Sequence, residues 1–223
     1  ASGDAVLTLT SLVAGTVTVT AEVNGTAIVN GSPATVEFVA DVPNVSVPTT
    51  FLEVTADGAA ADGAATNTVR AHITDANGNP APGQSVTFAI ATGTASFTTP
   101  VTVITDANGD ALVSLSSTVI GEVAITAEVN GTAIVNGSPA TVHFVADAPD
   151  VSVPTTFLEV TADGAAANGA ATNSVRAHIT DANGNPVSNQ TVTFVIASGT
   201  ATPVGSLPVT TDANGDAVLT LTS

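Results

Sequence analysis

The sequence predicts an all-β protein built from repeated units, and three observations support this prediction. The apolar content of 44% is ordinary for a packed core, but it comes largely from Val and Ala, with seven Phe and no Trp, Tyr or Met. Val and the abundant Thr favour strands, whereas the many Asn-Gly and Asp-Gly pairs favour tight turns. Finally, long stretches of the chain occur twice.

The repeat has a constant period. AEVNGTAIVNGSPATV stands at residues 21–36 and again at 127–142, and VPTTFLEVTADGAAA stands at 47–61 and 153–167. The offset is about 106 residues and the copies are about 70% identical, which is the signature of a tandem array rather than of domains with different chemistries. We therefore divide the chain into the C-terminal part of one repeat (1–46), a complete repeat (47–152) and the N-terminal part of a third (153–223).

Period-two alternation predicts seven strands in the complete repeat. They cover residues 50–56, 67–74, 85–91, part of 96–105, 111–116, 122–129 and 141–146. Seven short antiparallel strands separated by turns in about a hundred residues are typical of an immunoglobulin-like β-sandwich. The linkers carry Pro149 and Pro154 and are short, so we expect tandem sandwiches in an extended rod.

The two ends of the chain are incomplete repeats that overlap, because GDAVLTLTS occurs at residues 3–11 and again at 215–223. A half-sandwich exposes its core and an unpaired strand edge. We therefore expect each end to have a partner, either neighbouring repeats of the same chain or like chains end to end. Ala1 is not a natural start and no signal peptide or apolar membrane-spanning run is present, so we expect an internal part of a larger protein.

Charge excludes several functions. Nineteen Asp and Glu face only Arg70 and Arg176, there is no Lys, and the net charge is −17. Nucleic acid and anionic membranes would be repelled.

The absence of Cys excludes disulfides, so rigidity must come from packing, turns or a bound cation. Scarce Lys and Arg also remove most trypsin-type cleavage sites, as suits a location outside the cell.

A family resemblance rests on specific stretches. These are SVRAHITDANGNPVSNQTVTFVIASGTA followed by TTDANGDAVLTLTS, and GTVTVTAEVNGTA and TVEFVAD in an earlier copy. The paired TDANGN and TDANGD turns flanking a V-T-F strand resemble the bacterial Ig-like (Big_1) repeats of the intimin and invasin adhesins. The resemblance implies a rod anchored at the bacterial cell surface that carries a binding tip. The anchor and tip of that family are not in this sequence, so no receptor-binding residue carries over.

The DANG turns, at 75–79 and 106–110 and their equivalents from 181 and 212, are the main candidate metal site. Their D-x-N-x-D spacing partly resembles a calcium loop, but Gly stands fourth rather than sixth and no bidentate Glu follows. The alternative is a hairpin turn in which Asp binds its own backbone and Gly takes a positive φ. In an Ig-like sandwich both turns lie at the end where the chain enters, so they face the preceding repeat.

Carboxylates that gather between repeats would repel, and a divalent cation would bridge them. Interdomain Ca²⁺ is therefore a hypothesis, and no other cofactor is expected. Its candidate ligands are Asp41, Asp75, Asp106 and Asp110 at one junction and Asp147, Asp150, Asp181, Asp212 and Asp216 at the next.

The remaining polar residues predict surface pairs rather than catalysis. His72 and His178 point outward on a strand, His143 is expected to lie across from Glu128, and Arg70 is expected to pair with Glu53. There is no G-x-S-x-G elbow, and short loops provide no cleft for paired carboxylates. We therefore expect no enzyme activity and no small-molecule substrate.

The loop at 130–139, NGTAIVNGSP, interrupts the polar turns with apolar residues. Ala133, Ile134 and Val135 are compatible with a short extra strand, a plug against a neighbouring domain or an exposed adhesive patch. We favour packing against the next domain, because an identical exposed patch in every copy would make the rod sticky along its length.

Three functions follow. The first is a stiff extracellular spacer, the second is a self-assembling filament whose half-repeats complete one another, and the third is a loop-mediated module that binds a glycan or protein. The absence of Tyr and Trp disfavours the third, because binding sites are rich in these side chains.

Overall fold

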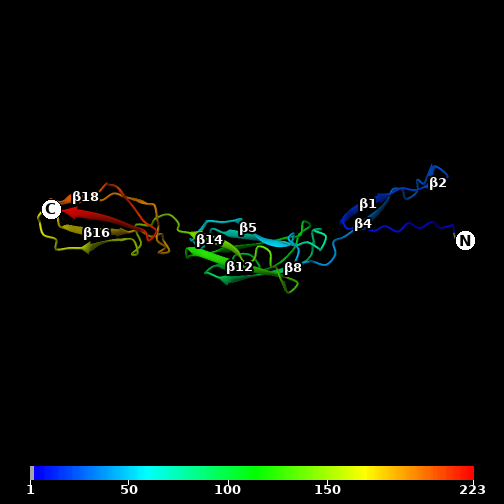
Figure 1. The fold of residues 1–223 in the computed structure, drawn as a ribbon, viewed down its shortest axis with the longest axis horizontal. Coiled ribbons are helices and arrows are strands. Elements are labelled where there is room, and N and C mark those ends of the chain that lie inside the picture. The colour runs from blue at the N-terminus through cyan, green and yellow to red at the C-terminus, as the bar shows by residue number, and fades with distance from the viewer. Residues whose placement is uncertain (1–2) are drawn as a thin grey trace.

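The computed structural model describes residues 3–223, which form three groups of strands placed end to end (Figure 1). The N-terminal group is blue, the central group runs from cyan to green, and the C-terminal group runs from yellow to red. All regular structure in these residues is β-strand, so they contain no helix able to cross a membrane. The all-β prediction is confirmed.

The central group is a two-sheet sandwich. One sheet has the order β5-β7-β11-β9, made of β5 (Phe51–Ala56), β7 (Asn67–His72), β11 (Asp110–Ser116) and β9 (Ser96–Phe97). The other has the order β10-β8-β12-β14-β6, with β10 (Thr102–Ile104), β8 (Ser85–Thr92), β12 (Gly121–Val129), β14 (Ala140–Val145) and β6 (Ala59–Ala60), and β13 (Thr132–Ala133) also pairs with β12.

Strict alternation places the apolar side chains between the two sheets. In β7, Val69 and Ala71 are buried while Arg70 and His72 point to the other face, and β12 buries every second residue from Val123 to Val129. Burial of these Val, Ile, Leu and Phe side chains is the main stabilising contribution, at about 1.5–3 kcal/mol for each large one. The predicted immunoglobulin-like sandwich is confirmed.

Two details depart from seven antiparallel strands. The fourth predicted strand is two strands, because β9 pairs with β11 in one sheet and β10 pairs with β8 in the other. The segment after β5 crosses to the second sheet, where β6 pairs with β14 in parallel. Asn67 holds this crossing: its side chain accepts the N–H of Ala59 and donates to the carbonyl of His143.

The outer groups contain fewer strands than the central group, and residues 5–10, which are equivalent to 111–116 of β11, form no strand. The N-terminal group has β1 (Gly15–Val19) paired with β4 (Ala34–Phe38), and β2 (Glu22–Val23) paired with β3 (Thr26–Ala27). The C-terminal group has a sheet of order β15-β16-β20-β18 and a separate pair, β17-β19. Their bounds are β15 (Phe157–Ala162), β16 (Thr172–His178), β20 (Asp216–Thr222), β18 (Thr202–Val204), β17 (Thr191–Val192) and β19 (Val209–Thr210).

One strand of the C-terminal group is much shorter than its central equivalent. β17 has two residues, whereas β8 has eight and pairs along most of its length with β12. Residues 193–198 have no strand equivalent to β12 beside them, so their backbone forms no ladder. The apolar faces of both outer groups are exposed, with Val17 and Val36 exposed in the N-terminal group and Leu158 in the C-terminal group.

Candidate functional site at the junctions between repeats

The DANG turns lie at the entrance end of each sandwich and fold alike. Asp75 Oδ1 accepts the N–H groups of Asn77 and Asn79 at 2.8 and 2.9 Å, and Asp106 Oδ1 accepts those two and four residues further on at 2.8 and 3.0 Å. Gly109 has a φ of +77°, and a Cβ there would collide with the carbonyl oxygen of Ile73. The predicted Asp-bonded turn with a positive-φ glycine is confirmed.

The fifth residue of the first turn contacts the preceding repeat. Asn185 Nδ2 donates to the carbonyl of Thr118 at 3.1 Å, and its Oδ1 accepts the N–H of Ile120 at 3.2 Å. The same amide nitrogen also donates to Asp181 Oδ2 at 2.9 Å, and that oxygen accepts the N–H of linker residue Asp147 at 3.1 Å. One network thus joins the turn, the linker and the preceding repeat.

The other junction repeats these contacts. Asn79 Nδ2 donates to the carbonyl of Leu12 at 3.0 Å and its Oδ1 accepts the N–H of Ala14 at 2.8 Å. Asp75 Oδ2 accepts both the Asn79 amide and the N–H of Asp41, at 2.8 and 3.1 Å. The sequence predicted that the turn faces the preceding repeat, but it did not predict that Asn79 or Asn185 makes the contact. The signal for this Asn is the contrast between DANGN and DANGD in both copies that contain the two turns.

The carboxylate that binds the linker, Asp75, is ionised throughout the physiological pH range. Burial raises the pKa of Asp75, but hydrogen bonds from the Asn79 side chain and from the backbone N–H groups of Asn79, Asp41 and Asn77 outweigh it and lower the pKa to about 2. Its contribution to stability is therefore fully present above the unfolded pKa near 4 and is lost as the pH falls through about 2. The pKa of Asp181 is lowered in the same environment.

The structure does not bring the nine predicted calcium ligands together. Asp41 and Asp147 approach Asp75 and Asp181 through backbone N–H groups, and Asp150 accepts bonds from Ser152. The remaining four, Asp106, Asp110, Asp212 and Asp216, are engaged within their own turns or with basic side chains. Within residues 3–223, no three acidic or His side chains are grouped as a metal site requires. Interdomain calcium stays a prediction.

The fifth residue of the second turn binds inside its own repeat. Asp110 accepts Arg70 Nη1 at 3.1 Å and lies 2.6 Å from His72 Nδ1, while Arg70 Nη2 lies 2.6 Å from Glu53. The guanidinium also stands 5.9 Å from the centre of the Phe51 ring. The predicted pair between Arg70 and Glu53 is confirmed, and Asp110 is the partner that the sequence did not reveal.

The predicted contact between His143 and Glu128 is wrong. The register of β12 and β14 places Glu122 opposite His143, with 3.4 Å between Glu122 Oε1 and His143 Nε2, and Asp57 lies 2.9 Å from His143 Nδ1. Glu128 is instead opposite Ala133 of β13. The error arises because β13 and the rest of the loop occupy the end of β12 that we assigned to β14.

The loop at 130–139 packs on its own repeat, so packing against the next domain is also wrong. Its first residues form β13, and Ile134 is 2% exposed within the central core. Asn136 Nδ2 donates to the carbonyls of Val47 and Thr50 at 2.8 and 2.9 Å. The loop therefore closes the entrance end of the sandwich over the start of β5.

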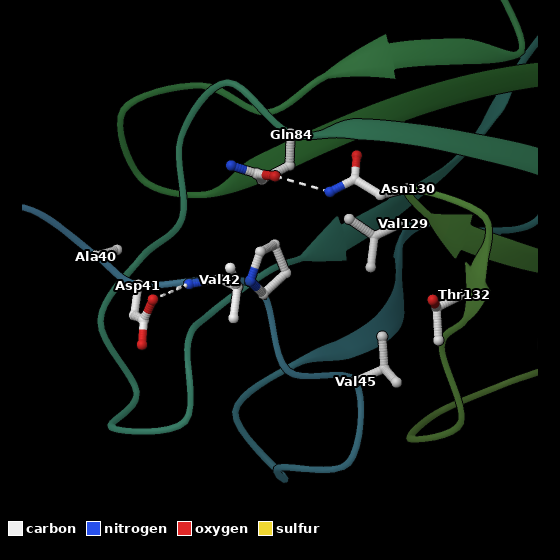
Figure 2. Close-up of a pocket in the computed structure, with 9 residues that line it drawn as sticks. Ala40, Asp41, Val42, Val45, Gln84, Val129, Asn130 and Thr132 are labelled. Atoms are coloured by element: carbon white, nitrogen blue, oxygen red, sulfur yellow. Dashed lines mark hydrogen bonds between the residues drawn. The ribbon is translucent and has the colours of Figure 1, made fainter.

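A hollow of about 490 Å³ lies where the linker passes this loop (Figure 2). Gln84 and Asn130 face each other across its edge, joined by a hydrogen bond of 2.8 Å. Its lining consists of Ala40, Asp41, Val42, Pro43, Val45, Gln84, Val129, Asn130 and Thr132. It holds one charged side chain and no aromatic ring, so it offers neither a stacking surface nor a cluster of convergent charges.

Comparison with known proteins defines the class. The family described as bacterial Ig-like domain (group 1) matches residues 49–145 and 155–223. The chain therefore belongs to this family of bacterial Ig-like domains, as the DANG turns and the sandwich indicated.

Particular relatives are adhesins. The chain is 35% identical to the inverse autotransporter adhesin YeeJ of Escherichia coli (strain K12), over all of this chain and 9% of YeeJ. The structure is similar to FdeC, an Escherichia coli adhesin (TM-score 0.62, 24% identity, 94% of this chain and 65% of FdeC), and to invasin, a bacterial integrin-binding protein (0.58, 23%, 94% and 40%). The chain thus corresponds to a small part of YeeJ, and the two structural likenesses show the fold.

Proposed function

We propose that this chain is a spacer region of an adhesin exposed outside the bacterial cell, in which tandem repeats set the distance between the surface and a binding part elsewhere. The observation that carries the proposal is that two successive junctions are closed by the same polar contacts in an end-to-end arrangement (Figure 1). Identical joints along a repeat array add length in fixed steps. The adhesin relatives support the location and the class.

The side chains support a function without catalysis. In residues 3–223 no hydroxyl group hydrogen-bonds to His72, His143 or His178, so no nucleophile is activated in the way that a catalytic triad requires. The hollow at the linker lacks aromatic anchors, which disfavours a binding module.

The spacer proposal is tested by changing the number of repeats. Residues 47–152 would be inserted once, twice or four times between an outer-membrane anchor and an epitope tag on bacteria, and the height of the tag above the membrane would be measured by super-resolution or atomic force microscopy. We expect a constant increment per repeat. A height that does not grow with repeat number would refute the spacer function, as would adhesion of the isolated chain to host cells or matrix.

We also propose a second candidate, a filament in which one chain completes the next. The observation that favours it is the open apolar face of the C-terminal group. Leu158 is 68% exposed, whereas its equivalent Leu52 is 3% exposed in the core of the central group, where its N–H donates to the carbonyl of Asn136 in the loop before β14. A hollow of about 480 Å³ on this face is lined by Phe157, Leu158 and Ile179 among others.

The N-terminal group carries the missing strands. Residues 15–38 are equivalent to 121–144, and Val17 and Val36 are each 39% exposed, whereas Val123 and Val142 are buried. A second copy of 15–38 would therefore cover the open face in a register that the central repeat already displays. Strand addition of this kind combines main-chain bonds with side-chain pockets.

Filament formation is tested by electron microscopy and sedimentation over a concentration series. We expect concentration-dependent filaments that Val36→Asp abolishes, because Val36 would point into the receiving core. The matched control is Thr35→Asp, which adds the same charge on the opposite face and should leave assembly intact. A chain that stays monomeric at all concentrations, or equal effects of both substitutions, would rule out complementation.

A further inference from the structure

The two DANG turns of each repeat form an internal comparison. Their first four residues are identical and their backbone bonds match, with the N–H of residue five donating to the first Asp at 2.9 Å in one turn and 3.0 Å in the other. Residue five is Asn79 or Asn185 in the first turn and Asp110 or Asp216 in the second. The turn itself therefore folds equally well with Asn or Asp, and the choice must reflect what the side chain contacts.

The contacts of Asn185 require an amide. Its NH₂ group donates to two acceptors, the carbonyl of Thr118 and the carboxylate of Asp181, while its oxygen accepts the N–H of Ile120. Asn185 is 7% exposed, so water cannot replace these partners freely. An Asp at this position would set a charged oxygen against two other oxygens.

The contacts on the preceding repeat are made with backbone atoms alone. Leu12 and Ala14 at one junction correspond to Thr118 and Ile120 at the other, yet both junctions show the same pair of bonds. A contact made only with backbone N–H and carbonyl groups tolerates sequence variation in the neighbouring repeat. At the second junction Asn183 adds a bond from its amide to the carbonyl of Ala61 at 3.0 Å.

We propose that Asn79 and Asn185 are the residues that fix the orientation of each repeat against the one before it. In this role the amide clamps a backbone loop of the preceding repeat, and the Asp of the same turn secures the linker through Asp41 or Asp147. The residue at position five thus separates an interface turn, DANGN, from an internal turn, DANGD. This inference rests on the proposed spacer function only for its biological purpose, since the clamp itself is a property of the junction.

The test measures the distance between two repeats. The chain has no Cys, so Glu128→Cys in the central group and Thr202→Cys in the C-terminal group, both at exposed positions, provide two unique sites for spin labels. Pulsed electron resonance on the full chain then gives the distribution of distances across the second junction. We expect a narrow distribution in the parent protein.

Asn185→Asp should broaden and shift this distribution, because two acceptors would then face the new carboxylate. Asn185→Ala, which removes the bonds without adding charge, should also broaden it and carries the test if Asn185→Asp does not fold. The matched control is Asn214→Asp, which adds the same charge at an exposed position of the internal turn and should leave the distribution unchanged.

A broad distribution in the parent protein, or an unchanged one in both Asn185 variants, would overturn the clamp. Equal broadening by Asn214→Asp would also overturn it, since net charge would then be the cause. These outcomes are independent of the spacer test: repeats joined by a clamp can fail to set surface height, and a spacer can work with flexible joints.

Discussion

Arg70 and Arg176 show how single side chains are used in this very acidic protein. Each guanidinium lies between two carboxylates, one on the neighbouring strand β5 or β15 and one at the start of β11 or β20. The side chain of Asp110 is 13% exposed, so its bonds to Arg70 and His72 are shielded from water more than a typical surface pair. The basic residues thus fasten the second DANG turn to the sheet.

We expect Asp110→Asn to destabilise the central repeat by about 1–3 kcal/mol, because it removes charge-assisted bonds while the backbone bonds of the turn remain. Hydrogen exchange of the buried amides of β7 and β11 measures the loss. Asp4→Asn is the control, since Asp4 is the exposed equivalent of Asp110 in the first copy. Equal losses in both variants would show that general charge, rather than this cluster, is responsible.

We expect His143 to give the stability of the central repeat a small pH dependence near neutrality. Its pKa is raised chiefly by the hydrogen bond to Asp57, and also by the charges of Asp57 and Glu122, which are the charged groups that face it. A raised folded pKa stabilises the repeat fully below the unfolded value of about 6.5, and that contribution is lost as the pH rises through the folded pKa.

Stability of the central repeat should therefore fall slightly between pH 6 and pH 8, and His143→Gln should remove this part of the dependence. Urea unfolding at the two pH values and an NMR titration of the imidazole provide the measurement. A folded pKa at or below that of a free histidine would contradict the prediction.

At the scale of elements, six of the seven predicted strands lie within one or two residues of their observed bounds, whereas β6, the division of the fourth strand and the sheet that each strand joins were not predicted. Alternation in Val69, Ala71 and Ile73 indicates which side chains are buried, yet it does not say which sheet a strand joins. The division into β9 and β10 and the parallel pair of β6 with β14 depend on backbone bonds that leave no hydrophobic pattern. The contact of Asn185 leaves a signal in the contrast between DANGN and DANGD, but the sequence does not show which backbone atoms its side chain reaches.

The loop between β12 and β14 is the element where this limit matters most. Its apolar residues signalled burial, but burial against the same repeat rather than the next one follows from the bonds of Asn136 to the chain before β5. Gly137, with a φ of +67°, lies against the carbonyl of Leu52, so a side chain would not fit there. The loop is a fixed part of the sandwich.

We expect Ile134→Ala to destabilise the central repeat by about 2–4 kcal/mol, because it leaves a cavity among buried side chains. Val135→Ala is the matched control: Val135 is 61% exposed, and its loss should change stability by no more than about 0.5 kcal/mol. Hydrogen exchange of the Ile125 amide in β12 follows the repeat without assuming that the three groups unfold together. Similar effects of both substitutions would mean that the loop is not packed as described.

At the scale of the whole molecule, the net charge is −17 and the repeats lie end to end (Figure 1). In residues 3–223 the carboxylates do not form a cluster of three or more at a junction. At each junction the carboxylate nearest the interface, Asp75 or Asp181, is surrounded by N–H donors. N–H groups attract an anion and repel a cation, so a calcium ion that binds Asp75 or Asp181 would have to displace them. The joints therefore depend on hydrogen bonds, which tolerate the surrounding negative charge.

Hydrogen-bonded joints and the predicted interdomain calcium differ in their response to cations. If hydrogen bonds alone hold the joints, Ca²⁺ and Mg²⁺ at equal ionic strength should raise the melting temperature equally, because both screen repulsion among the carboxylates. In low salt without added divalent ions, EDTA should leave the melting temperature unchanged. The spin-label distance across the second junction should be the same with either ion. Asp147→Asn keeps the backbone N–H that binds Asp181. It should therefore leave the effect of each ion on the melting temperature, and the spin-label distance, unchanged. A rise specific to Ca²⁺ that Asp147→Asn abolishes would instead establish interdomain calcium, and the rigidity of the rod would then depend on the cation.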